Sequence, residues 1–296
     1  MKYLLTFILI FTISCKNFEN KNEAKLLTNG EMSKIRDFVK VLNTALKEYN
    51  YDFIRDSWDH GLFRKRVTNL NSTERGVFDY IYESELAKDI ENANIELINQ
   101  IRHSFGKMTQ VKTNFVDGNH AELTYLMELD SRFYFIKYRI DIWDKKPKLS
   151  DIYFFKEDKW MSDGVKDMIR LNSRYTAMSK NRHDANRSYY NYQKALSNGD
   201  TITAFQELNN IPESHQITND IRIARINLAA HLNDSIFNEV INRELRTNQN
   251  VYIDYLIGLY LNDSLRNMES SVKVARKIGI SRKLLDSLHR KGLYWN

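Results

Sequence analysis

The fold is decided by the stretch from Asn119 to Trp143, which reads NHAELTYLMELDSRFYFIKYRIDIW. Apolar and polar residues alternate through it, and this period of two begins where a helical spacing ends, after Gly106. Such alternation is typical of strands that bury one face. We therefore expect a four-stranded antiparallel meander, and its strands should span Lys107–Val116, Asn119–Leu129, Arg132–Trp143 and Leu149–Lys156.

Helical spacing precedes the predicted sheet. Apolar residues recur every three or four positions from Ile35 to Tyr49 and again from Val77 to Ile101, which predicts helices that each bury one face. The second pattern fits one helix or two, and Ser72 and Thr73 are its N-cap candidates. Helices followed by a curved antiparallel sheet resemble the α+β cone of the NTF2-like and cystatin-like families. That resemblance covers Glu31 to Asp163 and rests on element order.

Helical spacing returns after Trp160 and continues to the end. Three similar turns contain Asp200, Asp234 and Asp263, which lie 34 and 29 residues apart, a period typical of helical-hairpin repeats. The turn Asn198-Gly199-Asp200, followed by Ala204, resembles tetratricopeptide repeats, and the resemblance extends over residues 189–290. It implies stacked helix pairs with an exposed concave surface. We therefore expect an α+β domain over residues 31–170 and an all-α helical-hairpin repeat domain over residues 171–296.

The first fifteen residues predict the location of the protein. Lys2 precedes an apolar run that ends at Ile13, which is shorter than the roughly 20 residues of a transmembrane helix and typical of an export signal. Ser14-Cys15 resembles the lipobox of bacterial lipoproteins, although Thr12 replaces the usual leucine. The resemblance implies lipidation at Cys15, and Lys16 after it implies the outer membrane. The alternative is an ordinary cleaved signal. Residues 16–30 are polar and predict a flexible tether.

Composition and motifs narrow the function classes. The net charge of +6 comes from 44 basic and 38 acidic residues that are interspersed, which argues against a nucleic-acid-binding protein. Cys15 is the only cysteine, and no two of the seven histidines are four residues apart, so we expect no disulfide, no metal and no cofactor. The G-x-S-x-G, P-loop and G-x-G-x-x-G motifs are absent.

One segment has the residue types of an acid–base site. Carboxylates and an imidazole beside an indole shift one another's pKa values when a pocket excludes water. Tyrosines of the third predicted strand are candidates for the wall of the same pocket. The alternative interpretation, which we favour, is a helix end with solvated acids and one buried tryptophan. The candidate pocket residues are Asp56, Trp58, Asp59, His60, Tyr134 and Tyr138.

Two candidate contact surfaces remain. Basic residues on the last predicted helices would suit anionic lipid headgroups, or they form a solvated face. They are Arg276, Lys277, Arg282 and Lys283. The second surface is a mixed face of the third strand, which would be available for interaction if it is uncovered. It comprises Phe133, Phe135, Lys137, Arg139 and Asp141.

Our leading hypothesis is a membrane-tethered, non-catalytic binding or scaffold lipoprotein of the bacterial envelope. Its helical repeats would present a surface to a protein or peptide partner. The alternative from another class is a small-molecule-binding protein or an isomerase- or hydrolase-like enzyme with a pocket in the α+β domain, in which Asp56, Asp59 or His60 serves as the acid or base.

The predicted anchor is tested by Cys15→Ser. Because the thiol is the atom that would carry the acyl chains, the variant should move from the membrane fraction to the soluble fraction when cells are lysed and fractionated. The unmodified chain, fractionated in parallel, is the control. An unchanged distribution of the variant would contradict lipidation at Cys15.

Overall fold

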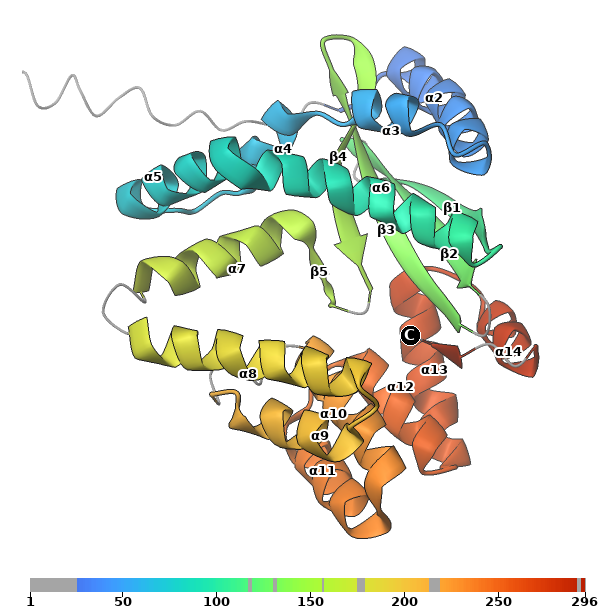
Figure 1. The fold of residues 1–296 in the computed structure, drawn as a ribbon. Coiled ribbons are helices and arrows are strands. Elements are labelled where there is room, and N and C mark those ends of the chain that lie inside the picture. Colours follow the sequence, from blue (N-terminus) through green and yellow to red (C-terminus); the bar gives the residue numbers. More distant parts are fainter. Residues whose placement is uncertain are drawn as a thin grey trace, which may run out of the picture.

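A computed structural model describes residues 26–116, 119–129, 132–155, 157–174, 179–212, 219–291 and 294–295. The predicted export signal, Cys15 and the first part of the tether lie outside these residues. As expected from the spacing, a region of helices and an antiparallel sheet comes first and an all-helical region follows (Figure 1). Among the described helices, none combines the length and the apolar character needed to cross a membrane.

The first helical region ends in one long run. A π-helical turn at Tyr82–Leu86 joins α5 to α6, so the second predicted pattern forms one continuous run of helix. Asn71 caps α5 instead of Ser72 or Thr73: its side chain accepts a hydrogen bond from the Glu74 amide, and the Glu74 carboxylate accepts one from the Asn71 amide. The helices before the sheet are α2 (Asn29–Lys47), α3 (Tyr51–Ser57), α4 (His60–Arg66), α5 (Ser72–Ile81) and α6 (Ala87–His103).

Five antiparallel strands form the sheet in sequence order. The predicted meander is extended by a short edge strand, β5, and a last strand, β6, runs parallel to the start of β3. β4 begins earlier than predicted, because Asp144 and Lys145 adopt positive φ and close a two-residue hairpin turn before it. The strands are β1 (Lys107–Val116), β2 (His120–Leu129), β3 (Arg132–Trp143), β4 (Lys146–Phe154), β5 (Lys159–Trp160) and β6 (Tyr294–Trp295).

The C-terminal helices pack in sequential pairs. α8 lies against α9, α10 against α11 and α12 against α13. Asp200 and Asp263 cap the second helices of the first and third pairs, whereas Asn233, the residue before Asp234, caps α11. The helices after the sheet are α7 (Met161–Arg174), α8 (Ser179–Ser197), α9 (Thr201–Asn210), α10 (Asn219–Leu232), α11 (Asp234–Thr247), α12 (Val251–Tyr260), α13 (Ser264–Ile278) and α14 (Arg282–Arg290).

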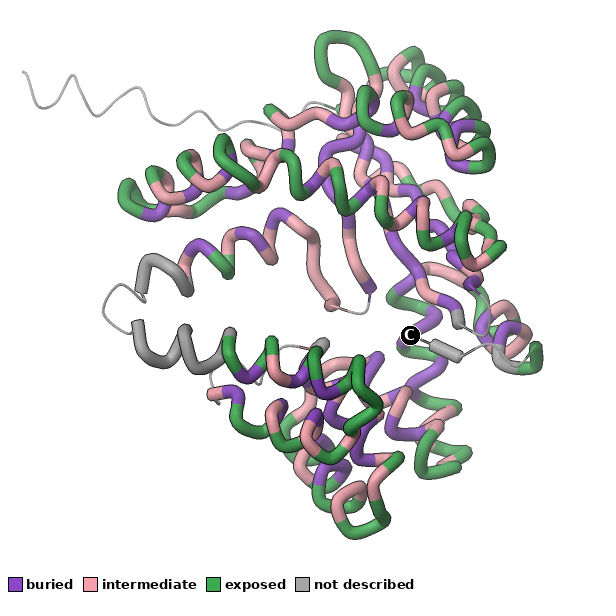
Figure 2. The backbone as a smooth tube through the Cα atoms, viewed as in Figure 1, coloured by how far each residue is buried: buried purple, intermediate pink, exposed green. Residues whose placement is uncertain are grey.

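The two faces of the sheet belong to two hydrophobic cores. One face, which includes Tyr125 and Tyr138, packs against α2–α7. On the other face, Phe133 and Phe135 pack against Tyr255, Leu285 and other residues of α12–α14. Figure 2 shows the buried residues running along the central strands and the inner sides of the helices. The apolar end of the mixed face is therefore covered by the chain's own C-terminal helices.

A leucine of α14 tests this second core. Leu285 is fully buried, so Leu285→Ala removes apolar contacts and leaves a cavity, and it should lower the free energy of unfolding by about 2–5 kcal/mol. Leu265→Ala is the matched control, because Leu265 on α13 is 69% exposed and its truncation should change stability by less than about 0.5 kcal/mol. Urea unfolding followed by circular dichroism measures both. Equal effects would show that α14 is not part of the core.

Candidate functional site

Charged side chains continue the mixed face of β3 beyond Phe133 and Phe135. Lys137 comes next on this face, and its ammonium lies 2.7 Å from the Glu122 carboxylate of β2. The same ammonium lies 5.4–5.9 Å from the ring centroids of Tyr153, Phe155 and Trp160, where cation–π attraction adds to the ion pair. Lys137 is therefore enclosed between one carboxylate and three aromatic rings.

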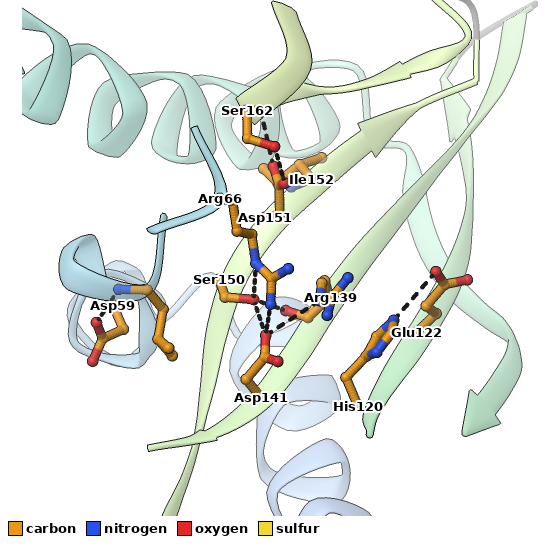
Figure 3. Close-up of polar contacts among 11 residues, drawn as sticks. Asp59, Arg66, His120, Glu122, Arg139, Asp141, Ser150, Asp151, Ile152 and Ser162 are labelled. Carbon is orange, nitrogen blue, oxygen red and sulfur yellow. Dashed lines mark hydrogen bonds and ion pairs between the residues drawn. The ribbon is translucent and has the colours of Figure 1, made fainter. Parts of the chain in front are cut away.

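Glu122 is stabilised as a carboxylate. Burial opposes its ionisation, but its interactions with His120 and Lys137 outweigh burial and lower the pKa of Glu122 to about 2. The buried His120 ring lies beside it, with Nε2 3.6 Å from Glu122 Oε1 (Figure 3). These three residues, on β2 and β3, face the same side of the sheet as Arg139 and Asp141.

Asp141 contacts two arginines and the hydroxyl of Ser150, a residue that lies in a β-bulge of β4. Ser150 is an extra residue in β4, because Leu149 pairs with Ile140 while Asp151 pairs with Arg139. The Ser150 hydroxyl and Arg66 Nη2 both donate to Asp141 Oδ2, and Arg139 Nε lies 3.3 Å from the same atom.

The approach of these side chains is seen in Figure 3, where Arg66 reaches in from the end of α4 and Arg139 approaches from β3. Burial opposes ionisation of Asp141, but the two guanidinium groups and the Ser150 hydroxyl lower its pKa. For Arg139, burial outweighs the attraction of Asp141 and lowers the pKa. One carboxylate is thus shared by two cations.

Asp151 joins the sheet to the start of α7. It is 2% exposed, and its Oδ1 accepts hydrogen bonds from the Ile152 and Ser162 amides at 2.9 and 3.2 Å. The Ser162 hydroxyl donates to Oδ2 at 2.5 Å. Burial outweighs these hydrogen bonds and raises the pKa of Asp151 to about 6. A carboxyl group with this pKa is able to exchange a proton near neutral pH.

Arg66, Arg139, Asp151 and Ser162 from these groups line a cleft of about 380 Å³. Sequence reasoning did not find it, because its walls come from α4, the loop after α4, β3, β4, β5 and α7. The sequence offered two partial signals: Arg139 on the mixed face, and the basic run Arg64-Lys65-Arg66, which contributes Lys65 and Arg66. We call this space the α4–α7 cleft, and its lining residues are Leu62, Lys65, Arg66, Thr68, Arg139, Asp151, Trp160, Ser162 and Asp163.

The candidate pocket residues near α3 and α4 have separate partners. Asp56 is exposed, whereas Trp58 is buried and forms a β-bridge with Leu149. The Asp59 carboxylate caps α4 by accepting from the Leu62 amide.

The imidazole and the tyrosines of that candidate pocket are placed elsewhere. His60 Nδ1 lies 2.7 Å from the Tyr82 hydroxyl, and Nε2 lies 2.9 Å from Glu91 Oε1. Tyr138 is buried in the first core, and Tyr134 is partly buried beside it. The α4–α7 cleft contains none of the six candidates.

The four residues of the candidate basic surface differ in their contacts. Lys277 pairs with Asp158 across to the sheet, and Arg282 pairs with Asp286 within α14 at 3.5 Å. Arg276 is exposed on α13, and Lys283 is exposed on α14. Two of the four predicted contact residues are therefore engaged in intramolecular ion pairs.

A second opening of about 480 Å³ lies between the first helices of two neighbouring pairs. None of its lining residues is Asp, Glu, Lys or Arg. Tyr189 and Leu196 on α8 are 46% and 41% exposed, and Asn227 on α10 accepts a hydrogen bond from the Tyr260 hydroxyl at 3.1 Å. We call this opening the α8–α10 groove, and it is lined by Tyr189, Tyr192, Gln193, Leu196, Leu208, Ile221, Ile223, Ala224, Asn227, Leu228 and His231.

Comparisons with protein families, curated proteins and solved structures found no match to this chain. Among the residues that the structure describes, no group of three or more His, Cys, Asp or Glu side chains is placed to hold a metal ion.

The raised pKa of Asp151 predicts a pH-dependent stability. A folded-state pKa of about 6, against an ordinary value of 3.8, means that the folded protein holds this proton more tightly than the unfolded chain does. The stability contributed by the protonated carboxyl is complete below the ordinary pKa and is lost as pH rises through 6. A shift of this size corresponds to roughly 2–3 kcal/mol.

Asp151→Asn isolates this effect, because asparagine has a similar shape and does not ionise. The variant should gain stability relative to the unmodified chain as pH rises from 4 to 7, measured by urea unfolding of both proteins across that range. A stability difference that stays constant with pH would contradict the raised pKa.

Proposed function

We propose that the chain is a membrane-tethered, non-catalytic binding lipoprotein of the bacterial envelope that holds a peptide segment of a partner protein in the α8–α10 groove. The observation that carries this proposal is the groove itself, which opens between α8 and α10 and is lined by neutral side chains. The membrane tether rests on Cys15 and on the signal before it, and the outer-membrane location rests on Lys16.

The helix pairs supply the scaffold in this proposal. We interpret α8–α9, α10–α11 and α12–α13 as three tetratricopeptide-like repeats, supported by the sequential packing of each pair and by the Asp or Asn cap of each second helix. In such an array the first helices of the pairs line one surface. The α8–α10 groove lies on that surface, so an extended segment would contact two repeats at once.

The lining of the groove suits a peptide with few charges. Amide side chains such as Gln193 and Asn227 have both donors and acceptors, which are what a peptide backbone needs. Tyr189 and Leu196 offer exposed apolar surface, and tyrosine is enriched in protein interfaces. We favour binding over the enzyme alternative because Asp56, Asp59 and His60 make separate contacts.

The groove is tested with neighbouring tyrosines on α8. Partners are first recovered from envelope extract with the immobilised protein, and their binding segments are then measured as peptides by calorimetry. Tyr189→Ala should weaken peptide binding about tenfold or more, because it removes exposed apolar surface from the groove. Tyr190→Ala is the matched control, since Tyr190 is 67% exposed and lies outside the groove.

Two results would reject the proposal. One is the recovery of no partner above background from envelope extract. The other is a partner whose affinity falls equally in both tyrosine variants, since the α8–α10 groove would then not be its binding site.

A further inference from the structure

The α4–α7 cleft has an excess of positive charge. Its lining includes three basic residues, Lys65, Arg66 and Arg139, and two acidic ones. Both acids are engaged: Asp151 accepts three hydrogen bonds from Ile152 and Ser162, and Asp163 pairs with Lys166 on α7 at 2.6 Å. These contacts hold both carboxylates in place, and neither makes a direct ion pair with an arginine, although Asp151 interacts electrostatically with Arg66 and Arg139.

The arginines have unused donors. Both approach the same oxygen of Asp141, so one negative charge serves two guanidinium groups. Within the described part of the chain, Arg66 Nη1 and both terminal nitrogens of Arg139 make no hydrogen bond. The two side chains are 18% and 23% exposed, and solvent reaches these donors, so an incoming anion would replace water on them. Paired N–H groups of a guanidinium match the two oxygens of a carboxylate or phosphate.

The rest of the lining would accommodate more than an inorganic ion. A cleft of about 380 Å³ is in the size range of small-molecule sites. Leu62 and the Trp160 ring provide apolar wall, while Thr68 and Ser162 provide hydroxyl groups. The Trp160 ring is fixed by an edge contact with Tyr153, 5.4 Å between ring centroids, so this wall is formed before a ligand arrives.

We propose that the α4–α7 cleft binds a small organic anion, with its carboxylate or phosphate group held by Arg139 and Arg66 and its body against Trp160. Lys65 also lines the cleft and adds a third positive charge to it, with its ammonium over the Trp143 ring at 3.8 Å from the ring centroid. This site is separate from the α8–α10 groove, so its failure or success does not decide the peptide-binding function.

The test uses the full chain in nonionic detergent, titrated at constant ionic strength with phenyl phosphate, benzoate and inorganic phosphate. Tryptophan fluorescence and calorimetry report binding, because Trp160 lines the cleft. We expect saturable binding, with phenyl phosphate binding more tightly than inorganic phosphate. Comparison of phenyl phosphate with benzoate identifies the preferred anionic group, and benzyl alcohol is the uncharged control.

Variants assign the binding to the cleft. Arg139→Gln should weaken phenyl phosphate or benzoate about tenfold or more, since a hydrogen-bonded charge is lost. Lys65→Gln should weaken the binding of phenyl phosphate and of benzoate several-fold. Because Lys65 is exposed, this variant tests the cleft even if the Arg139 variant fails to fold. Arg276→Gln, on the exposed surface of α13, should change nothing. Absence of saturation, equal binding of benzyl alcohol, or equal weakening by Lys65→Gln and Arg276→Gln would overturn the proposal.

Discussion

The packing of α12–α14 on the second face of the sheet is the constraint on which the rest of the structure depends. Phe133, Phe135 and Leu126 need an apolar cover, and these helices supply it with Tyr255 and Leu285. The chain must therefore turn back to the sheet after four intervening helices, α8–α11. The cover also stops short of the middle of β3, where the side chains change from aromatic to charged.

In the charged half of that face, each carboxylate is stabilised by ion pairs or hydrogen bonds to neighbouring side chains and backbone amides. Isolated buried charges are strongly disfavoured, and each one here has at least one partner of opposite sign or several hydrogen bonds. Glu122 has Lys137, Asp141 has both arginines, and Asp151 has the start of α7. Three donors converge on one oxygen of Asp141: the two arginines and the Ser150 hydroxyl, which the bulge directs toward it. Polar side chains thereby fix the position of α4 and α7 relative to the sheet.

The sequence predicted what local patterns control and missed what long-range contacts control. A period of two placed β1 and β3 with the observed ends, because the alternation of side chains between two faces is a local property of an extended strand. β5 has two residues, too few to show a period. Arg66 and Ser162 could not be assigned to one cleft, since they lie 96 residues apart and meet only through β3 and β4. Conversely, the neighbours Asp59 and His60 point to different partners, because closeness in sequence does not place side chains in one cavity.

Because the chain returns to β3 at its end, the intervening helices α8–α11 can vary in number without changing the sheet. α7 leaves from β5, and α12–α14 and β6 come back to the same sheet, so α8–α11 form an excursion whose two ends are fastened to one support. The structure of such a segment has to satisfy two conditions: its ends must lie at the right separation, and it must pack against α12. Its length is not constrained by the sheet. Helix pairs could be gained or lost within it during evolution while the sheet and both of its cores stayed the same. The helix pairs that we propose to bind a partner would then diversify independently of the sheet and its cores.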